Sequence, residues 1–425
     1  MSNAQARHQE LLDQYRQIQA RKLNLDLTRG KPATAQLDLS RALDGILQND
    51  YRCEDGSDAR NYGGALGIPE ARRFAADYLD VAVEQVMVGG NSSLQLMYQY
   101  VAHAMLQGVR GPGSAWLDEL ADGQRIKFLC PAPGYDHHFA ICEALDIEMI
   151  PVAMTEQGPD MDAVEALLRN DPLIKGIWCV PKYANPNGVV YGDDVVERFA
   201  GLGKLAGPNF RIMWDNAYAV HHLVDNPPEL ANLITLSEAQ GTLDNAVVIG
   251  STSKITFAGA GIAFVATSEA NIKHFVNYLG VATIGPDKVN QLRHVRFLNN
   301  MESLHALMEQ HRAILQPKFE LVLEHLNKAL AGRSANGEPL GRWTVPAGGY
   351  FVLFDTQPGL ADKVVALCAD AGVKLTPAGS TWPYGKDPAN TNIRLAPSFP
   401  SLAEIDEAMQ VFTLCVELAT LEMAV

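Results

Sequence analysis

Two polar side chains that could work together in catalysis follow apolar runs of the chain. Asp215 comes directly after the run 211–214, and Lys254 comes after the run 246–249 and a short stretch of glycine and hydroxyl residues. A lysine in an apolar, partly desolvated site loses its charge readily and can act as an amine nucleophile. Taken singly, such an acid is usually a helix cap and such a lysine a solvated charge, so only the combination indicates a site.

Two turns have the composition of ligand-binding loops. Tyr183–Gly188 contains Asn-Pro-Asn-Gly after another buried-looking run, and Val88–Leu94 has the pattern of a strand, a glycine-rich turn and a helix start. The free N–H groups and the dipole at a helix N-terminus favour a phosphate group. The second stretch is not a P-loop, because no Lys-Ser or Lys-Thr pair follows it. Each pattern alone is also typical of an ordinary turn.

The elements that must position these residues alternate between strand-like and helical patterns from about residue 70 to residue 270. Amphipathic stretches such as Leu94–Gln107 and Met161–Asn170 separate short apolar runs. Strands that alternate with helices predict βαβ units and a mainly parallel sheet, in which ligands bind beyond the carboxyl ends of the strands. The runs that we expect to be strands are 85–88, 126–130, 148–152, 174–180, 211–214, 246–249 and 262–266.

The two ends of the chain follow other patterns. Residues 4–22 predict a polar helix, after which Gly30 and Pro32 mark a loop. Residues 287–331 predict long helices, and strand-like runs after Gly332 predict a smaller α+β domain. The expected division is an N-terminal arm with part of the small domain at 1–50, a large domain at 51–315 and a small C-terminal domain at 316–425.

The composition excludes several classes of protein. Apolar residues make up 47% of the 425 residues, which is ample for large cores, and the net charge of −15 argues against nucleic-acid binding. None of the six cysteines forms a C-x-x-C pair, so we expect reduced core residues and no metal site. The N-terminus lacks a signal-peptide core and no apolar stretch is long enough for a membrane span, which predicts a cytoplasmic protein.

Several motifs occur in one order along the chain. They are Asn61-Tyr62-Gly63, Gly67-Ile68-Pro69-Glu70-Ala71-Arg72, Pro133-Gly134-Tyr135, Asn185-Pro186-x-Gly188, Asp215-x-x-Tyr218, Ser251-x-Ser253-Lys254 and Asn392-Ile393-Arg394-Leu395. Together they resemble the fold-type I pyridoxal-5′-phosphate (PLP) enzymes of the aminotransferase class I/II superfamily, over nearly the whole chain. The stretches 27–32 and 251–257 are most similar to a bacterial subgroup of aspartate aminotransferases. The resemblance implies an α/β fold, with a mainly parallel seven-stranded sheet flanked by helices and a smaller α+β domain.

The resemblance also implies the cofactor PLP and a set of residues around its ring. Lys254 would hold PLP as a Schiff base and, once the substrate has displaced it, would move the proton between substrate and cofactor. Asp215 would pair with the pyridinium nitrogen and so keep the ring an electron sink. Asn185 and Tyr218 would hydrogen-bond the ring oxygen, and Tyr135 would stack on the ring face.

Further residues are implied for the phosphate and the substrate. The phosphate would be held by Asn91, Ser92, Ser93, Ser251 and Ser253. Tyr62 would reach the phosphate of a neighbouring subunit, which requires a homodimer with shared active sites. Arg394 would bind the substrate α-carboxylate as a bidentate fork, with Gly30 packed close to it and Asn185 beside it.

One position departs from the family pattern. Related enzymes usually carry an arginine a few residues after the Schiff-base lysine, where it pairs with the phosphate, but this chain has Gly261 and Ile262 there. Another cation, the helix dipole or the partner subunit must then neutralise the phosphate. Lys182 is a candidate, although an exposed loop lysine is the simpler interpretation.

The sequence predicts the cofactor more firmly than the reaction. Transamination needs the loss of the Cα proton, which Lys254 suits, but a β-lyase or a decarboxylase could use much the same residues. We expect aspartate or glutamate as amino donor and 2-oxoglutarate as acceptor, because of Arg394 and the subgroup resemblance. A second cation should then face the side-chain carboxylate, and the candidates are Arg29, Arg60 and Arg296.

Two rival classes fit less well. A PLP-dependent transcription regulator resembles an aminotransferase with an added N-terminal helix-turn-helix domain, and only about 30 residues precede the motif-bearing body here. A dinucleotide-binding oxidoreductase is suggested by Gly259-Ala260-Gly261, but the third glycine and the acid about 20 residues later are missing.

Overall fold

The computed structural model describes residues 3–335 and 337–424, and its largest element is a sheet of eight strands within that part of the chain. In spatial order the strands are β2 (Val86–Val88), β9 (Ala263–Ala266), β8 (Ala246–Ser251), β7 (Arg211–Asp215), β6 (Ile174–Cys179), β3 (Lys127–Ala132), β4 (Glu148–Thr155) and β5 (Gly158–Pro159). The central strands pair in parallel, whereas β9 is antiparallel to both its neighbours and β5 to β4. The mainly parallel α/β sheet is confirmed. The expected count of seven strands is wrong by one, because the two-residue β5 adds a strand too short to leave a pattern in the sequence.

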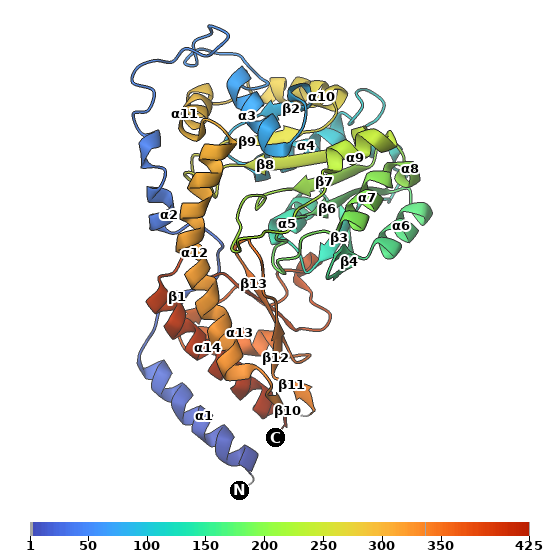
Figure 1. Ribbon diagram of the computed structural model, residues 1–425. Coiled ribbons are helices and arrows are strands. Elements are labelled where there is room, and N and C mark those ends of the chain that lie inside the picture. The colour runs from blue at the N-terminus through green and yellow to red at the C-terminus, as the bar shows by residue number, and fades with distance from the viewer. Residues whose placement is uncertain (1–2, 336, 425) are drawn as a thin grey trace.

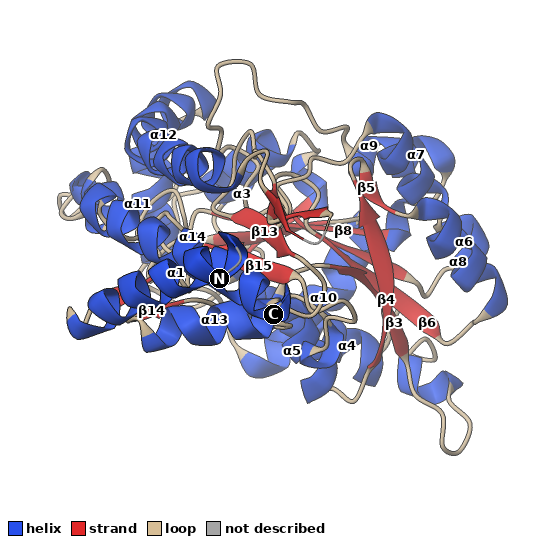
Figure 2. Ribbon diagram, turned by 90° about the horizontal axis from the view of Figure 1, so that it is seen from below, coloured by secondary structure: helices blue, strands red, loops and turns tan. Residues whose placement is uncertain are grey.

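Helices cover both faces of this sheet, which explains why its strands read as unbroken apolar runs. Along β7, Ile212 and Trp214 pack in one hydrophobic cluster and Met213 packs in another, as expected for side chains that alternate across a strand. Figure 2 shows α6, α7, α8 and α9 on one side of the sheet and α4, α5 and α10 on the other. The flanking helices are α3 (Pro69–Leu79), α4 (Ser93–Leu106), α5 (Asp136–Ala144), α6 (Met161–Asn170), α7 (Asp193–Gly201), α8 (Gly203–Ala206), α9 (Leu233–Gln240), α10 (Glu269–Ala282) and α11 (Lys288–Leu298).

A second body is built around a small antiparallel sheet in the C-terminal part of the chain. Its strands are β12 (Gly341–Trp343), β13 (Val352–Thr356) and β15 (Asn392–Leu395), and it packs with α13 (Ala361–Asp370) and α14 (Leu402–Ala424). The N-terminal helix α1 (Asn3–Ala20) joins the same core through buried Leu11 and Tyr15, and β1 (Leu25–Asp26) pairs in parallel with β14 (Val373–Lys374). A short hairpin of β10 (Ser334–Ala335) and β11 (Glu338–Pro339) precedes this sheet.

The long helix α12 (Met301–Leu330) connects the two bodies, as Figure 1 shows. Leu304 at one end of α12 belongs to a cluster of the large sheet, and Val322 further along belongs to the core of the small one. The division of the chain at residues 50 and 315 stays a prediction.

The cysteines are free and buried, as the sequence predicts for reduced core residues. Within the described ranges, no group of histidine, cysteine and acidic side chains is arranged to hold a metal ion. None of the described helices combines the length and the apolar character that crossing a membrane requires.

Candidate active site

Lys254 lies in the turn that follows β8, beyond the carboxyl end of the strand. The backbone N–H groups of Ile255 and Thr256 both donate to the carbonyl of Thr252 at 2.9 Å, which makes the segment one turn of helix. The Lys254 Nζ atom lies 4.8 Å from the centroid of the Tyr218 ring. Burial lowers the pKa of Lys254, and the nearby Asp215 carboxylate partly opposes that shift. Burial thus makes the uncharged amine, which is the nucleophilic form, easier to reach than it is in water.

Asp215 is the last residue of the neighbouring strand β7 and is only 3% exposed. Its Oδ2 atom lies 3.1 Å from Nε2 of His138, whose ring stacks on Trp178 with centroids 4.4 Å apart. Its Oδ1 atom is buried and has no hydrogen-bond partner among the described residues. An unpaired buried carboxylate oxygen is costly, so this atom fits a ligand that donates a hydrogen bond, such as a protonated ring nitrogen.

Three further side chains expected around a cofactor ring lie near this carboxylate. Asn185 and Tyr218 are buried at 3% and 4% exposure. Tyr135 immediately precedes α5, and its ring meets the ring of His138 edge-on at 4.9 Å. Burial raises the pKa of Tyr218 well above its ordinary value, so its hydroxyl stays protonated and can donate a hydrogen bond.

The expected phosphate loop lies between β2 and α4, with Ser92 as the N-cap of α4. The Ser92 Oγ atom accepts from the N–H of Gln95 at 3.1 Å, which leaves other first-turn N–H groups of the helix for a ligand. The hydroxyl of Ser253 donates to the carbonyl of Asn91 at 3.3 Å. The Asn91 side chain donates to the carbonyl of Gly259 at 3.0 Å. The structure thus brings the loop together with the segment around Lys254, as predicted.

One of the two positions where relatives carry the phosphate-binding arginine, Gly261, has little room for a side chain. A Cβ atom on Gly261 would lie 2.9 Å from Oγ1 of Thr252 and 3.1 Å from the backbone nitrogen of Ser253. The Lys182 Nζ atom lies 5.8 Å from the Tyr183 ring centroid, and no contact of this lysine with the phosphate loop is found in the described part of the chain. Arg293 of α11 instead lines a cavity of about 380 Å³ together with Gly90, Asn91 and Gly259.

Arg394 on β15 belongs to the small sheet and reaches across to the large one. Its Nη1 atom donates to Oδ1 of Asn185 at 3.2 Å and to Oδ1 of Asp136 at 3.3 Å. Its Nη2 atom donates to Oγ1 of Thr376 at 3.4 Å. Its Nε atom is buried and lacks a partner within the described ranges, so a donor is left for a bound carboxylate.

Gly30 packs against the same arginine through Phe351. The Arg394 guanidinium carbon lies 4.9 Å from the centroid of the Phe351 ring. A Cβ atom on Gly30 would overlap the tip of that ring. Gly30 and Arg394 thus both pack against Phe351, while the role expected of Gly30 beside the substrate stays a prediction.

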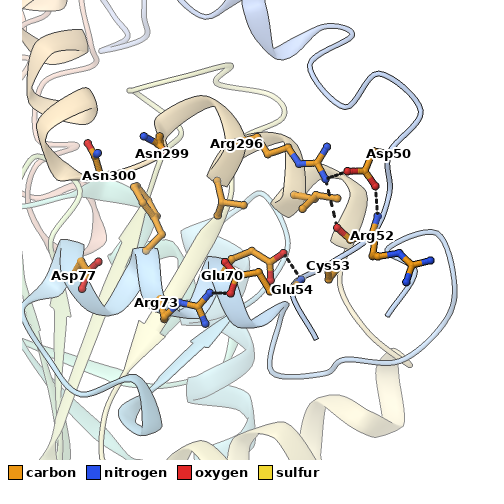
Figure 3. Close-up of a pocket in the computed structure, with 13 residues that line it drawn as sticks. Asp50, Arg52, Cys53, Glu54, Glu70, Arg73, Asp77, Arg296, Asn299 and Asn300 are labelled. Carbon is orange, nitrogen blue, oxygen red and sulfur yellow. Dashed lines mark hydrogen bonds and ion pairs between the residues drawn. The ribbon is translucent and has the colours of Figure 1, made fainter. Parts of the chain in front are cut away.

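The candidates for a second carboxylate-binding cation lie in different places. Arg296 donates to Oδ2 of Asp50 at 2.8 Å in a separate cavity of about 480 Å³, seen in Figure 3, which contains none of the expected site residues. Arg60 is paired with Asp58 on the surface. Only Arg29, which is exposed and adjoins Gly30, lies on a segment that passes the site.

Comparison with known proteins decides the family. The family model described as "Aspartate amino-transferase" matches residues 1–425. The chain belongs to the aspartate aminotransferase family. An aspartate aminotransferase of Corynebacterium glutamicum is 44% identical over 416 residues, which cover 98% of this chain and 94% of that protein. A relative from Mycolicibacterium smegmatis is 46% identical over 420 residues, which cover 98% of this chain and 96% of the relative.

Solved structures agree with this assignment. The crystal structure of an aspartate transaminase from Corynebacterium glutamicum superposes with a TM-score of 0.94 at 42% identity and covers 100% of this chain and 98% of that one. The α-aminoadipate aminotransferase of Thermus thermophilus superposes with a TM-score of 0.74 at 21% identity, over 96% of each chain, which shows the shared fold alone. This aminotransferase is therefore an enzyme, and the family implies PLP as its cofactor.

The buried atoms of this aminotransferase fit that cofactor. The unpaired Oδ1 atom of Asp215 offers a partner for a ring nitrogen. The amine of the half-buried Lys254 offers a partner for an aldehyde carbon, and the first turn of α4 offers one for a phosphate. The sequence reasoning missed His138, the partner of Asp215. Its place three residues after Tyr135, at the start of a helix, is a spacing that puts both on one face and could have indicated it.

Proposed function

We propose that this aminotransferase moves an amino group from aspartate or glutamate to 2-oxoglutarate by a ping-pong reaction that uses PLP. The observation that carries the proposal is the grouping of Lys254, Asp215 and Arg394, because the first two lie beyond adjacent strands and the third reaches them from the other core. Arg394 and Asp215 are both buried, at 7% and 3% exposure. When bound, PLP supplies an electron sink that stabilises negative charge at the substrate Cα.

The proposed roles follow from the positions of the side chains. Lys254 holds the cofactor through Nζ and, once released, moves the Cα proton, and burial that lowers the pKa of its amine brings that amine closer to the form that accepts a proton. Asp215 holds a proton on the ring nitrogen through Oδ1, while His138 occupies Oδ2. Asn185 and Tyr218 orient the ring through its oxygen, and Tyr135 covers one face.

The phosphate and carboxylate sites orient the two ligands. Asn91, Ser92, Ser93, Ser251 and Ser253 are proposed to hold the phosphate, supported by the bonds between Ser253 and Asn91. Arg394 is proposed to bind the α-carboxylate, with Gly30 and Asn185 setting its position. Arg29 is the remaining candidate for the side-chain carboxylate of a dicarboxylic substrate, because Arg60 and Arg296 are paired with acids elsewhere.

A homodimer with shared sites is part of the proposal. Tyr62 is 84% exposed, and the nearby Ile284 is 65% exposed. The two lie on neighbouring loops, because a Cβ atom on Gly285, next to Ile284, would overlap the carbonyl oxygen of Gly63, next to Tyr62. Two large apolar side chains held in water on adjacent loops support burial against a second copy. The buried free cysteines support a reducing compartment such as the cytoplasm.

The absorption spectrum of the purified protein tests the proposal. We expect a near-violet band of bound PLP that aspartate alone removes and 2-oxoglutarate restores, because the two half-reactions are separate. A band that aspartate leaves unchanged would contradict the amino donor and point to another amino acid or to lyase chemistry. If no band forms even after PLP is added, the role of Lys254 is wrong.

A further inference from the structure

The carbonyl groups of Lys254 and Ile255 lie at the end of a single turn of helix. Within the described part of the chain, no backbone N–H of a following turn donates to either of them. Buried side chains bind both of them instead. The Lys254 carbonyl accepts from Nε2 of His221 at 3.3 Å and from the hydroxyl of Tyr350 at 3.5 Å. The Ile255 carbonyl accepts from Nε2 of His311 at 2.9 Å and from the hydroxyl of Ser40 at 3.5 Å. The backbone of the catalytic lysine is thus held by four side chains.

The side-chain amide of Gln36, in α2 (Thr34–Asp38), connects two of these four side chains, His311 and Tyr350. It is fully buried at 0% exposure. Its Nε2 atom donates to Nδ1 of His311 at 3.2 Å and to the hydroxyl of Tyr350 at 3.0 Å. Its Oε1 atom accepts from the N–H of Ala33 at 3.0 Å. Both amide hydrogens and the amide oxygen of Gln36 are therefore used.

The proton positions in this network have one consistent solution. The Ile255 carbonyl can only accept, so His311 carries its proton on Nε2 and accepts from Gln36 through Nδ1. The Tyr350 hydroxyl accepts from Gln36 and therefore donates to the Lys254 carbonyl. Burial lowers the pKa of His311 and raises that of Tyr350, so both groups stay in the neutral forms that the network requires.

The members of the network come from parts of the chain that are far apart in sequence. Gln36 lies in the N-terminal segment, His311 in α12, and Tyr350 just before β13 of the small sheet. The lysine lies on the large sheet. Gln36 is thus a direct link between the N-terminal segment, α12 and the small body next to the lysine turn.

We propose that Gln36 is a positioning residue for the Lys254 amine, and that it acts through His311 and Tyr350 on the lysine backbone. The inference rests on the role proposed for Lys254 above. A donor at position 36 keeps His311 in one tautomer and turns the Tyr350 hydroxyl toward the lysine carbonyl. Without that donor, Tyr350 and His311 lose their fixed orientation and the turn that carries Lys254 is free to shift.

The test compares Gln36→Leu with Gln357→Leu in the full-length protein. Gln357 is also buried and also makes three hydrogen bonds, at 3.0, 3.1 and 3.1 Å, but to carbonyls of the hairpin segment around β10 and β11. Both variants should lose thermal stability. Only Gln36→Leu should weaken PLP binding to the apoprotein, by about tenfold. It should also lower kcat about tenfold, because a small misplacement of a reacting group slows the reaction. The KM for aspartate should change less than about twofold. The pH midpoint of the near-violet band should also move in this variant alone.

A second variant keeps the test decisive if Gln36→Leu does not fold. Gln36→Glu retains the size and the bond from Ala33, but its carboxylate attracts the Tyr350 hydroxyl away from the Lys254 carbonyl, so the band midpoint should again move. Equal PLP affinity and equal band midpoints in the Gln36 variants and Gln357→Leu would overturn the positioning role alone. A wild-type protein without the band would overturn the role of Lys254 and this inference with it.

Discussion

Replacing Arg394 by lysine tests the substrate site most directly. A lysine keeps the positive charge but offers a point charge in place of the planar fork. In the structure the guanidinium uses Nη1 for Asn185 and Asp136 and Nη2 for Thr376, and its Nε is unpaired. We expect Arg394→Lys to lose one charge-assisted hydrogen bond to the substrate carboxylate.

The magnitude follows from that single bond. A hydrogen bond to a charged group contributes about 1.5–3 kcal/mol, which corresponds to a fall in kcat/KM of about 10- to 150-fold for aspartate. The affinity for PLP should change little, because Arg394 bonds Asn185, Asp136 and Thr376 and none of the residues of the phosphate loop. Single-turnover absorbance changes with aspartate at several concentrations separate the binding step from the chemical step.

The matched control is Arg296→Lys, which alters the same side-chain type in the cavity of Figure 3, where it pairs with Asp50. It should leave kcat/KM within about twofold of the wild type, since surface ion pairs contribute little. A kcat/KM of Arg394→Lys within threefold of the wild type would refute the clamp. An equal loss in both variants would mean that the side-chain type matters and the position does not.

Three further results are expected. Gly30→Ala should raise KM for aspartate several-fold, because the new methyl group displaces the Phe351 ring and overpacking costs about 1–3 kcal/mol. An unchanged KM in steady-state assays would contradict this. Arg293→Leu should weaken PLP binding about tenfold but leave the binding of pyridoxal, which lacks the phosphate, unchanged in titrations of the apoprotein. Burial lowers the pKa of His103 and of His294 to about 4, and that of His221 to about 3. These histidines stay neutral in the folded state, whereas the same histidines in the unfolded chain take up protons below a pH of about 6.5. Each should therefore lower the free energy of unfolding by about 1.4 kcal/mol per pH unit as the pH falls from about 6.5 toward about 4. Thermal midpoints measured at pH 8, 6 and 5 should then fall, and a flat profile would show that these groups ionise alike in both states.

The strands of the large sheet were predictable because burial on both faces leaves a continuous apolar run. The run 211–214 became β7, which extends one residue further, to Asp215. Strand β5 was not predictable, since Gly158–Pro159 is too short to show a period and exists through its pairing with the end of β4. Helix α14 was also predictable, because Ser401-Leu402-Ala403-Glu404 has the pattern of a capping box. The helix begins at Leu402, and the Glu404 carboxylate accepts from the N–H of Ser401 at 2.7 Å.

The residues of the site also differ in whether their sequence neighbours or distant contacts determine their place. Lys254 and Asp215 could be proposed because their own neighbours in sequence mark the ends of strands. Gln36 could not, because what gives it its place is its bond to His311, 275 residues further along the chain. His138 bonds Asp215, 77 residues on, so only its spacing from Tyr135 could have indicated it. Hydrogen bonds of this kind leave no pattern in the sequence around either partner.

Helix α12 limits how far the angle between the two cores can change. Its 30 residues span about 45 Å, and it is held by the large core at Met308 and by the small core at Leu315. Pro317, which removes one backbone hydrogen bond, lies just beyond this boundary. A change in the angle between the cores must therefore bend α12, most easily near Pro317, and the energy needed rises with the angle. The amine of Lys254 and the guanidinium of Arg394 sit on opposite cores, so the stiffness of α12 acts together with the direct contacts between the cores to set the distance between these two groups.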